Sequence, residues 1–150
     1  PSRRYAPLPL APANTHDMAS LAAFWTGQDL EIRERVGLAD AAETKKAKRE
    51  REQHKAMLVK RLVPEGLLDD EEGPDPAELR GAVHAFLART PSALVGLSLD
   101  DLAGEVDPVN VPGVGPDEYP SWTRRMHLAL EELPFDESVA CALRAGRRAP

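Results

Sequence analysis

The apolar residues of the chain form two short runs typical of strands, separated by longer stretches with helical spacing. The first run lies in the opening PSRRYAPLPLAPAN and alternates leucines with prolines, so it predicts an extended segment that donates few ladder hydrogen bonds. The second run, ALVGL at residues 93–97, is bounded by Pro91 and Ser98 and predicts a fully buried parallel strand.

A short amphipathic helix is predicted directly after the first run. Leu21, Phe24 and Trp25 lie at i, i+3 and i+4, which gives the helix one apolar face. Asp17 precedes them at a position from which it could cap the helix, and Gly27 is placed to end it.

A second short helix, at residues 29–36, is followed by a long charged one. Asp40 and Glu43 have the spacing of a capping box, and Pro64 closes the helix. Its middle, ETKKAKREREQHK, holds six basic and three acidic residues with almost no apolar face. The basic run at 45–55 is therefore interpreted as a solvated face.

The clearest helix start is at Asp75, with Pro76 at the first helical position and Glu78 completing a second capping box. The sequence Thr90-Pro91 ends this helix. Its apolar stripe consists of Leu79, Val83, Phe86 and Leu87.

The last third of the chain combines a loop with two predicted helices. Four prolines and two glycines between residues 107 and 120 predict an ordered loop. A short helix from 121 to 133, a break at Pro134 and a final helix capped by Asp136 are expected to follow. Two strands cannot close a barrel, so this mostly α-helical chain is predicted to be part of a larger α/β architecture.

Composition narrows the classes of partner. The chain has 150 residues and a net charge of −6, from 19 basic and 25 acidic side chains, which disfavours nucleic acid. Charged residues and prolines interrupt every apolar stretch, so we expect no membrane span. Cys141 is the single cysteine, which fits a reducing compartment such as the cytoplasm. Because the chain begins at Pro1 and carries no leader pattern, we expect its gene product to start upstream.

Three stretches, in order and at similar spacing, resemble the bacterial 4-α-glucanotransferases (amylomaltases, or disproportionating enzymes) of glycoside hydrolase family seventy-seven. They are YAPLPLAPANTHDMASLAAFWTGQDLEIRERVGL at 5–38, RTPSALVGLSLDDL at 89–102 and VDPVNVPGVGPDEYPSWTRRMHLALEEL at 106–133. A lone Thr-His-Asp would be weak, whereas the ordered set is specific to the family.

The resemblance implies that the chain is the C-terminal segment of a (β/α)8 TIM barrel and supplies its last two strand–helix units. Residues 1–38 would hold strand seven, the active-site loop and the next helix, and residues 39–91 a helical insertion. Residues 92–120 would hold strand eight and a substrate loop, and residues 121–150 the C-terminal helices. Active sites of such barrels lie at the carboxyl ends of the strands, where Thr-His-Asp and the loop both fall.

The resemblance also implies roles for individual residues. Asp17 would be the carboxylate that stabilises the transition state, with His16, Asn110, Pro112 and Gly113 in the substrate site. The nucleophile and the acid/base of this retaining reaction would lie upstream of Pro1, so we expect the isolated chain to be inactive. No metal or cofactor is expected, and the expected partners are α-1,4-glucans and the N-terminal remainder of the same enzyme.

Plainer interpretations of the same residues stay open. Asp17 could serve merely as a helix cap, and His16 could be an ordinary surface residue. Asn110 could do no more than form hydrogen bonds with the backbone of its own loop. Trp25 and Trp122 could stack on sugars, but their helical spacing favours core packing.

Two other classes of protein also stay open. A free-standing helical interaction module would use the charged helix and the last amphipathic helix. A fragment of an α-amylase-type hydrolase would also place His-Asp after a seventh strand, but those enzymes lack the VNVPG and SWTRR elements present here.

Overall fold

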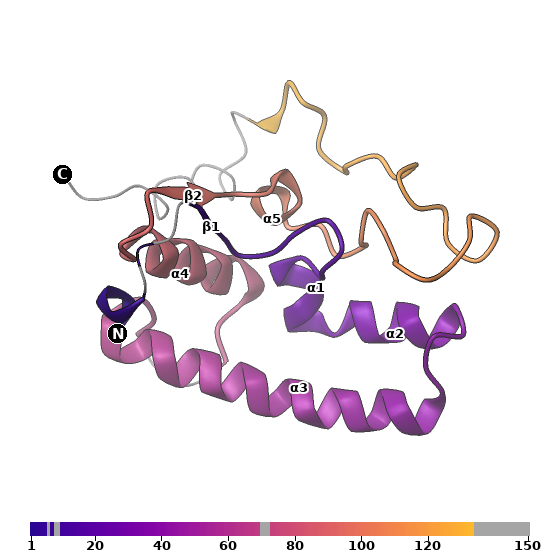
Figure 1. The fold of residues 1–150 in the computed structure, drawn as a ribbon, viewed down its shortest axis with the longest axis horizontal. Helices are drawn as coiled ribbons and strands as arrows, with labels where there is room; N and C mark the ends of the chain where they lie inside the picture. The colour runs from indigo at the N-terminus through magenta and orange to yellow at the C-terminus, as the bar shows by residue number, and fades with distance from the viewer. Residues whose placement is uncertain (6, 8–9, 70–72, 134–150) are drawn as a thin grey trace.

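A computed structural model describes residues 1–5, 7, 10–69 and 73–133 of the chain. The elements form a two-stranded sheet above a layer of helices, with a long loop extending from one end (Figure 1). In chain order they are η1 Ser2–Arg4, β1 Leu10–Pro12, α1 Leu21–Thr26, α2 Gln28–Arg35, α3 Ala41–Leu62, η2 Val63–Glu65, α4 Pro76–Ala88, β2 Leu94–Gly96 and α5 Leu99–Ala103.

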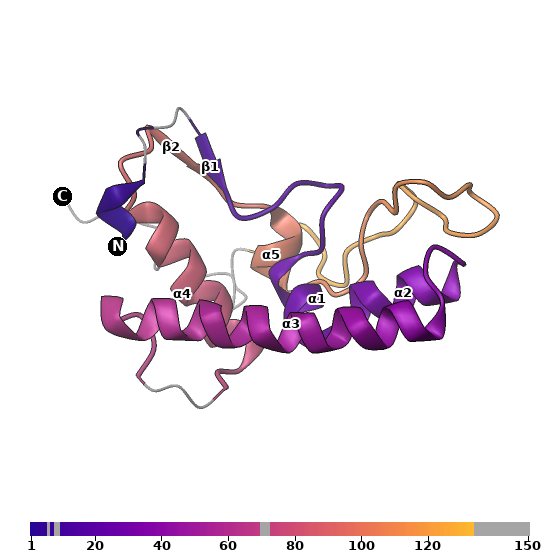
Figure 2. The ribbon, with the colours of Figure 1, turned by 60° about the horizontal axis from the view of Figure 1, so that its bottom comes forward.

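The two predicted strands pair in parallel, with Leu10 opposite Leu94 and Pro12 opposite Gly96. The parallel strand predicted at 93–97 is therefore confirmed, although its predicted full burial is wrong. Leu10 is 51% exposed and Leu94 is 64% exposed, because no further strand covers the sheet in the described part of this chain. Both strands run side by side toward α1 and α5 (Figure 2), so the segments that follow them emerge at the same edge.

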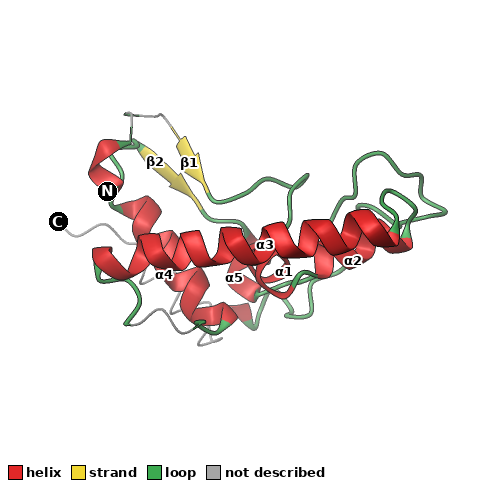
Figure 3. Ribbon diagram, turned by 90° about the horizontal axis from the view of Figure 1, so that it is seen from below, coloured by secondary structure: helices red, strands yellow, loops and turns green. Residues whose placement is uncertain are grey.

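The helices pack beneath the sheet around a shared apolar cluster. The long helix α3 lies on the side of the layer away from the strands, as the view from below shows (Figure 3). Leu62 of α3 and Leu79 of α4 are almost fully buried, and Trp25 of α1 packs against the same cluster. The predicted packing of Trp25 in the core is confirmed, and the cluster holds α1 in place below the sheet edge.

Local capping signals set most of the helix ends. Asp40 and Asp75 each accept hydrogen bonds from two backbone N–H groups and complete the two predicted capping boxes. The predicted cap of α1 is wrong, because Ser20 and not Asp17 accepts the hydrogen bond from the N–H of Ala23. A turn closed by the hydrogen bond from Met18 N–H to the Thr15 carbonyl precedes the helix, and it leaves the Asp17 carboxylate free for another role.

The segment after α5 consists of turns and irregular stretches from residue 104 to residue 132. The predicted loop at 107–120 is confirmed, whereas the predicted helix at 121–133 is wrong. Trp122 has a φ of 67°, outside the helical region, and its N–H donates to the Val109 carbonyl at 2.8 Å. Arg124 is drawn instead to Asp100 at 2.6 Å, so tertiary contacts override the helical pattern. The helix expected after Asp136 lies outside the described residues, as does Cys141.

None of the helices in the described part of the chain is both long and apolar enough to cross a membrane.

Candidate active site

The loops that follow the two strands meet through Asp17 and Asn110. The Asn110 amide donates to Oδ1 of Asp17 at 2.6 Å, although the two residues are 93 positions apart in sequence. Because β1 and β2 are parallel, both loops leave the sheet at its carboxyl edge, which is why this contact can form. Two of the predicted site residues are therefore brought into direct contact.

His16 and Trp122 complete the cluster around the carboxylate. Nε2 of His16 lies 3.5 Å from Oδ2 of Asp17, on the oxygen that Asn110 does not occupy. The imidazole also faces the indole of Trp122, with ring centroids 5.2 Å apart and planes tilted by 52°. His16 and Asp17 are each more than half exposed and Trp122 is 62% exposed, so the cluster is open to a ligand in this chain.

Trp122 is the residue of this cluster that the sequence interpretation misplaced. Helical spacing to Met126 predicted a core position, whereas the side chain is exposed on a turn beside His16. A non-glycine residue at a φ of 67° is strained, and such strain persists only where surrounding contacts hold it, often at functional sites. No local signal in the sequence marked this turn, because a proline just before a predicted helix, as Pro120 is, also fits a helix start.

Pro112 and Gly113 lie further along the same loop. Gly113 has a φ of 93°, so the predicted tight turn is present and requires glycine. Its backbone lies beside Leu38, since a methyl group added there would come within 3.7 Å of that side chain. The neighbouring Val111 packs with Ile32 and Tyr119, which anchors the loop on α2. The described contacts therefore tie this part of the loop to α2, while Asn110 reaches Asp17.

A pocket of about 420 Å³ lies next to the cluster and includes Thr15, His16, Asp107 and Arg124 in its lining. Arg124 pairs with Asp100 at 2.6 Å and with Glu105 at 3.0 Å. Burial opposes the charge of Arg124, but the hydrogen bond to Asp100 and the two carboxylates outweigh it and raise its pKa. Arg124 therefore keeps its positive charge, which the two carboxylates balance. These ion pairs hold its side chain in the wall of the pocket.

In the part of the chain that the structure describes, no group of three or more His, Cys, Asp or Glu side chains is arranged to hold a metal ion.

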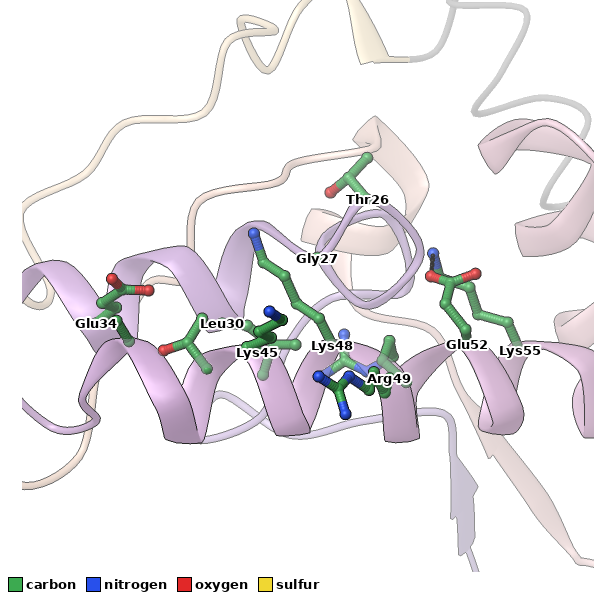
Figure 4. A pocket seen from close by; sticks show the side chains of 12 residues that line it. Thr26, Gly27, Leu30, Glu34, Lys45, Lys48, Arg49, Glu52 and Lys55 are labelled. Atoms are coloured by element: carbon green, nitrogen blue, oxygen red, sulfur yellow. Dashed lines mark hydrogen bonds and ion pairs between the residues drawn. The ribbon is translucent and has the colours of Figure 1, made fainter.

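A second pocket, of about 530 Å³, lies between α2 and α3 (Figure 4) and is lined mainly by charged side chains. Three cations of its wall are paired: Arg51 with Asp29 at 2.7 Å, Lys48 with Glu31 at 2.8 Å and Lys55 with Glu52 at 2.7 Å. The solvated face predicted at 45–55 is thus wrong for Arg51, whose side chain is mostly buried. This groove is a salt-bridged contact between two helices.

Removing the mostly buried guanidinium of Arg51 from the pocket between α2 and α3 is expected to destabilise the chain. Arg51 donates to both oxygens of Asp29, at 2.8 and 2.7 Å, and to the Phe24 carbonyl at 2.7 Å. Arg51→Ala should therefore lower the free energy of unfolding by roughly 1.5–3 kcal/mol, as for hydrogen bonds to charged groups. Arg49→Ala removes an exposed arginine of the same helix and should change it by less than about 0.5 kcal/mol. Urea unfolding of both variants checks this; equal losses would contradict it.

Polar side chains gathered at the carboxyl edge of parallel strands are the arrangement found in α/β enzymes. The comparison with protein families identifies which enzymes these are, since the family model for 4-alpha-glucanotransferase matches residues 1–131. The chain therefore belongs to the 4-alpha-glucanotransferase family.

Individual relatives agree with this assignment. The chain is 35% identical to the 4-alpha-glucanotransferase of Mycobacterium tuberculosis (strain ATCC 25618 / H37Rv), over 99% of this chain and 21% of that protein. It is 28% identical to that of Haemophilus influenzae, over 86% of this chain and 19% of that protein. The crystal structure of amylomaltase from Corynebacterium glutamicum superimposes with a TM-score of 0.91 at 27% identity, over 99% of this chain and 23% of that one. The chain thus spans about a fifth of its relatives' length.

Proposed function

We propose that this chain is the C-terminal segment of a complete 4-α-glucanotransferase and forms the last two strand–helix units of its (β/α)8 barrel. Three observations support this placement. The strands β1 and β2 pair in parallel, Leu10 and Leu94 of this sheet are exposed, and the chain superimposes on an amylomaltase. The helical segment 39–91 would connect the two units, and residues 121–150 would continue from the second. The upstream remainder of the enzyme would supply the other strands.

The contact between Asn110 and Asp17 is the observation that carries the proposed activity. In a retaining transfer an upstream carboxylate attacks the anomeric carbon, while an upstream acid protonates the departing glucan oxygen. The acceptor 4-hydroxyl, deprotonated by the same group, then displaces the enzyme carboxylate. With Oδ1 of Asp17 held by the amide at 2.6 Å, Oδ2 and the His16 imidazole are left to bind sugar hydroxyls. Asp17 would thereby stabilise the distorted ring of the transition state.

Trp122 would provide an apolar platform for one glucose unit beside that carboxylate. The apolar faces of a pyranose ring stack on exposed aromatic rings, and this indole lies against His16. Trp122→Ala is expected to raise KM for maltotriose about tenfold, which corresponds to about 1.4 kcal/mol of binding, and to lower kcat less.

Two further variants separate this loss of stacking from a loss of structure. Trp122→Gly also removes the ring but relieves the strain at a φ of 67°, so it should raise KM as much as Trp122→Ala without lowering the melting temperature. Trp25→Phe, in the core cluster, should leave KM unchanged. Steady-state kinetics on maltotriose checks the set, and an unchanged KM in both Trp122 variants would refute the platform.

The activity itself is tested by incubating the complete polypeptide with maltotriose. Transfer between glucans should give glucose together with longer maltooligosaccharides, while the number of reducing ends stays constant. An α-amylase-type hydrolase would increase the number of reducing ends, and an interaction module would leave maltotriose intact. Chromatography of the products combined with a reducing-end assay separates these three outcomes.

The proposed substrate is consistent with the charge of the chain. Neutral α-1,4-glucans need hydrogen-bonding groups and not a charged surface, and the site offers an amide, an imidazole and a carboxylate. The net charge of −6 disfavours nucleic acid. We propose a cytoplasmic enzyme of glucan metabolism that requires no cofactor.

A further inference from the structure

A buried carboxylate outside the proposed site lies directly beneath the loop that carries His16 and Asp17. Asp101 of α5 is 0% exposed. Its two oxygens accept hydrogen bonds from the Asn14 amide at 3.0 and 2.8 Å, and Oδ1 also accepts from the Leu21 N–H at 2.7 Å. One side chain therefore fixes the position before Thr15 and the first residue of α1.

These contacts close the intervening segment into a loop whose two ends are held by the same group. Asn14 also donates to the Ala19 carbonyl at 3.3 Å, within the loop. Ser20 is fixed independently, since its hydroxyl donates to the Glu105 carbonyl at 2.5 Å. The exposed His16 and Asp17 are thus carried by a short span between buried anchors, so their positions depend on those anchors.

The charge of Asp101 is maintained despite its burial. Desolvation would raise the pKa of Asp101, but the His84 side chain, the Leu21 N–H and the Asn14 amide together lower it. His84 of α4 is itself 0% exposed, and its Nε2 lies 3.9 Å from Oδ2 of Asp101. The charged carboxylate of Asp101 binds the Asn14 amide and the Leu21 N–H more strongly than a neutral acceptor would. The hydrogen-bonded anchor therefore joins α5 to Asn14 and to the start of α1, while His84 of α4 lies beside it.

We propose that Asp101 is a positioning residue, which acts through Asn14 and Leu21 to hold Asp17 and His16 in the geometry needed for glucan transfer. This inference rests on the proposed function, because it assigns Asp101 a role in that same reaction. A merely structural carboxylate would affect folding and leave turnover of the folded enzyme intact.

An exchange of the two side chains tests the inference in the complete enzyme. Asp101→Asn points an amide at the Asn14 amide and should lower kcat for maltotriose at least tenfold, with KM changed less than threefold. The double variant Asn14→Asp/Asp101→Asn restores a donor facing an acceptor, and the carbonyl oxygen of the amide introduced on α5 can still accept from the Leu21 N–H. It should recover at least a third of the lost kcat. Val59→Ala, in the helical layer, should keep kcat within twofold while the enzyme stays folded.

A double-mutant cycle and hydrogen exchange complete the test. In an Asp17→Asn background, Asp101→Asn should lower kcat by much less than in the unmodified enzyme, because most of its effect passes through Asp17. Hydrogen exchange of the backbone amides at residues 14–21 should accelerate at least tenfold in Asp101→Asn. In the Asn14→Asp/Asp101→Asn double variant it should return toward the rate of the unmodified enzyme. The inference would be overturned if Asp17→Asn and Asp101→Asn lowered kcat independently of each other. It would also be overturned if the double variant Asn14→Asp/Asp101→Asn did not recover the kcat lost in Asp101→Asn. If Asp17→Asn itself turns over normally, the proposed site fails, and unchanged amide exchange would then separately overturn the positioning role.

Discussion

Asp17→Asn in the complete enzyme is expected to lower kcat and kcat/KM together by about 10²–10³-fold, the range seen when a transition-state hydrogen-bonding group is removed. The carboxylate would bind sugar hydroxyls most strongly as positive charge develops on the ring, and the neutral amide cannot match that interaction. The change preserves the shape of the side chain. In the unmodified chain the Asn110 amide donates to Oδ1 of Asp17 at 2.6 Å, and the amide oxygen of the variant can still accept this hydrogen bond.

The stability of the same variant separates catalysis from structure. Ser20 caps α1, so Asp17→Asn removes no helix cap, and the free energy of unfolding should change by less than about 0.5 kcal/mol. Asp40→Asn is the matched control, since it makes the same chemical change at a true cap and should leave turnover unaltered. Maltotriose turnover and the melting temperature of both variants decide the matter. Near-normal turnover of Asp17→Asn would remove this residue from the catalytic site.

The 150-residue chain alone is expected to show no transferase activity on maltotriose. The proposed nucleophile and acid/base lie in the upstream part of the enzyme, and positioning groups cannot form a glucosyl–enzyme bond by themselves. Glucose release is the measurement, with the complete polypeptide as the positive control and a buffer blank as the baseline. Release by the purified chain above that blank would contradict both the proposed division of the site and the barrel-segment interpretation.

Features that depend on neighbouring residues could be predicted from the sequence. The capping boxes at Asp40 and Asp75 need only a side chain and the next three residues, and both are present as expected. The run at 93–97 was also recognisable as a strand from its bounds, whereas the prolines around β1 predicted only an extended segment. The exposure of the two strands was not predictable, because burial depends on neighbouring strands that the described part of this chain does not contain.

Features that depend on distant contacts could not be predicted in this way. Ser20 and not the predicted Asp17 caps α1, and the Ser20 hydroxyl is itself held by the carbonyl of Glu105, 85 positions along the chain. Helical spacing misplaced Trp122, whose backbone is held by Val109 across the loop. Asp17 and Asn110 were suggested by family resemblance, and their contact depends on the pairing of β1 with β2 and its register, which no local pattern encodes.

The contact between Asp17 and Asn110 closes a loop of 93 residues, and this separation has a consequence for how family members can diverge. For a flexible loop the closure entropy rises only with the logarithm of length, so doubling one exposed turn within the connecting region would cost about 0.6 kcal/mol. The pairing of β1 with β2 and the packed helices that lie between these strands in the sequence hold the two ends together. We therefore expect the surface of the connecting region to tolerate insertions and deletions, while the geometry at its two ends stays the same.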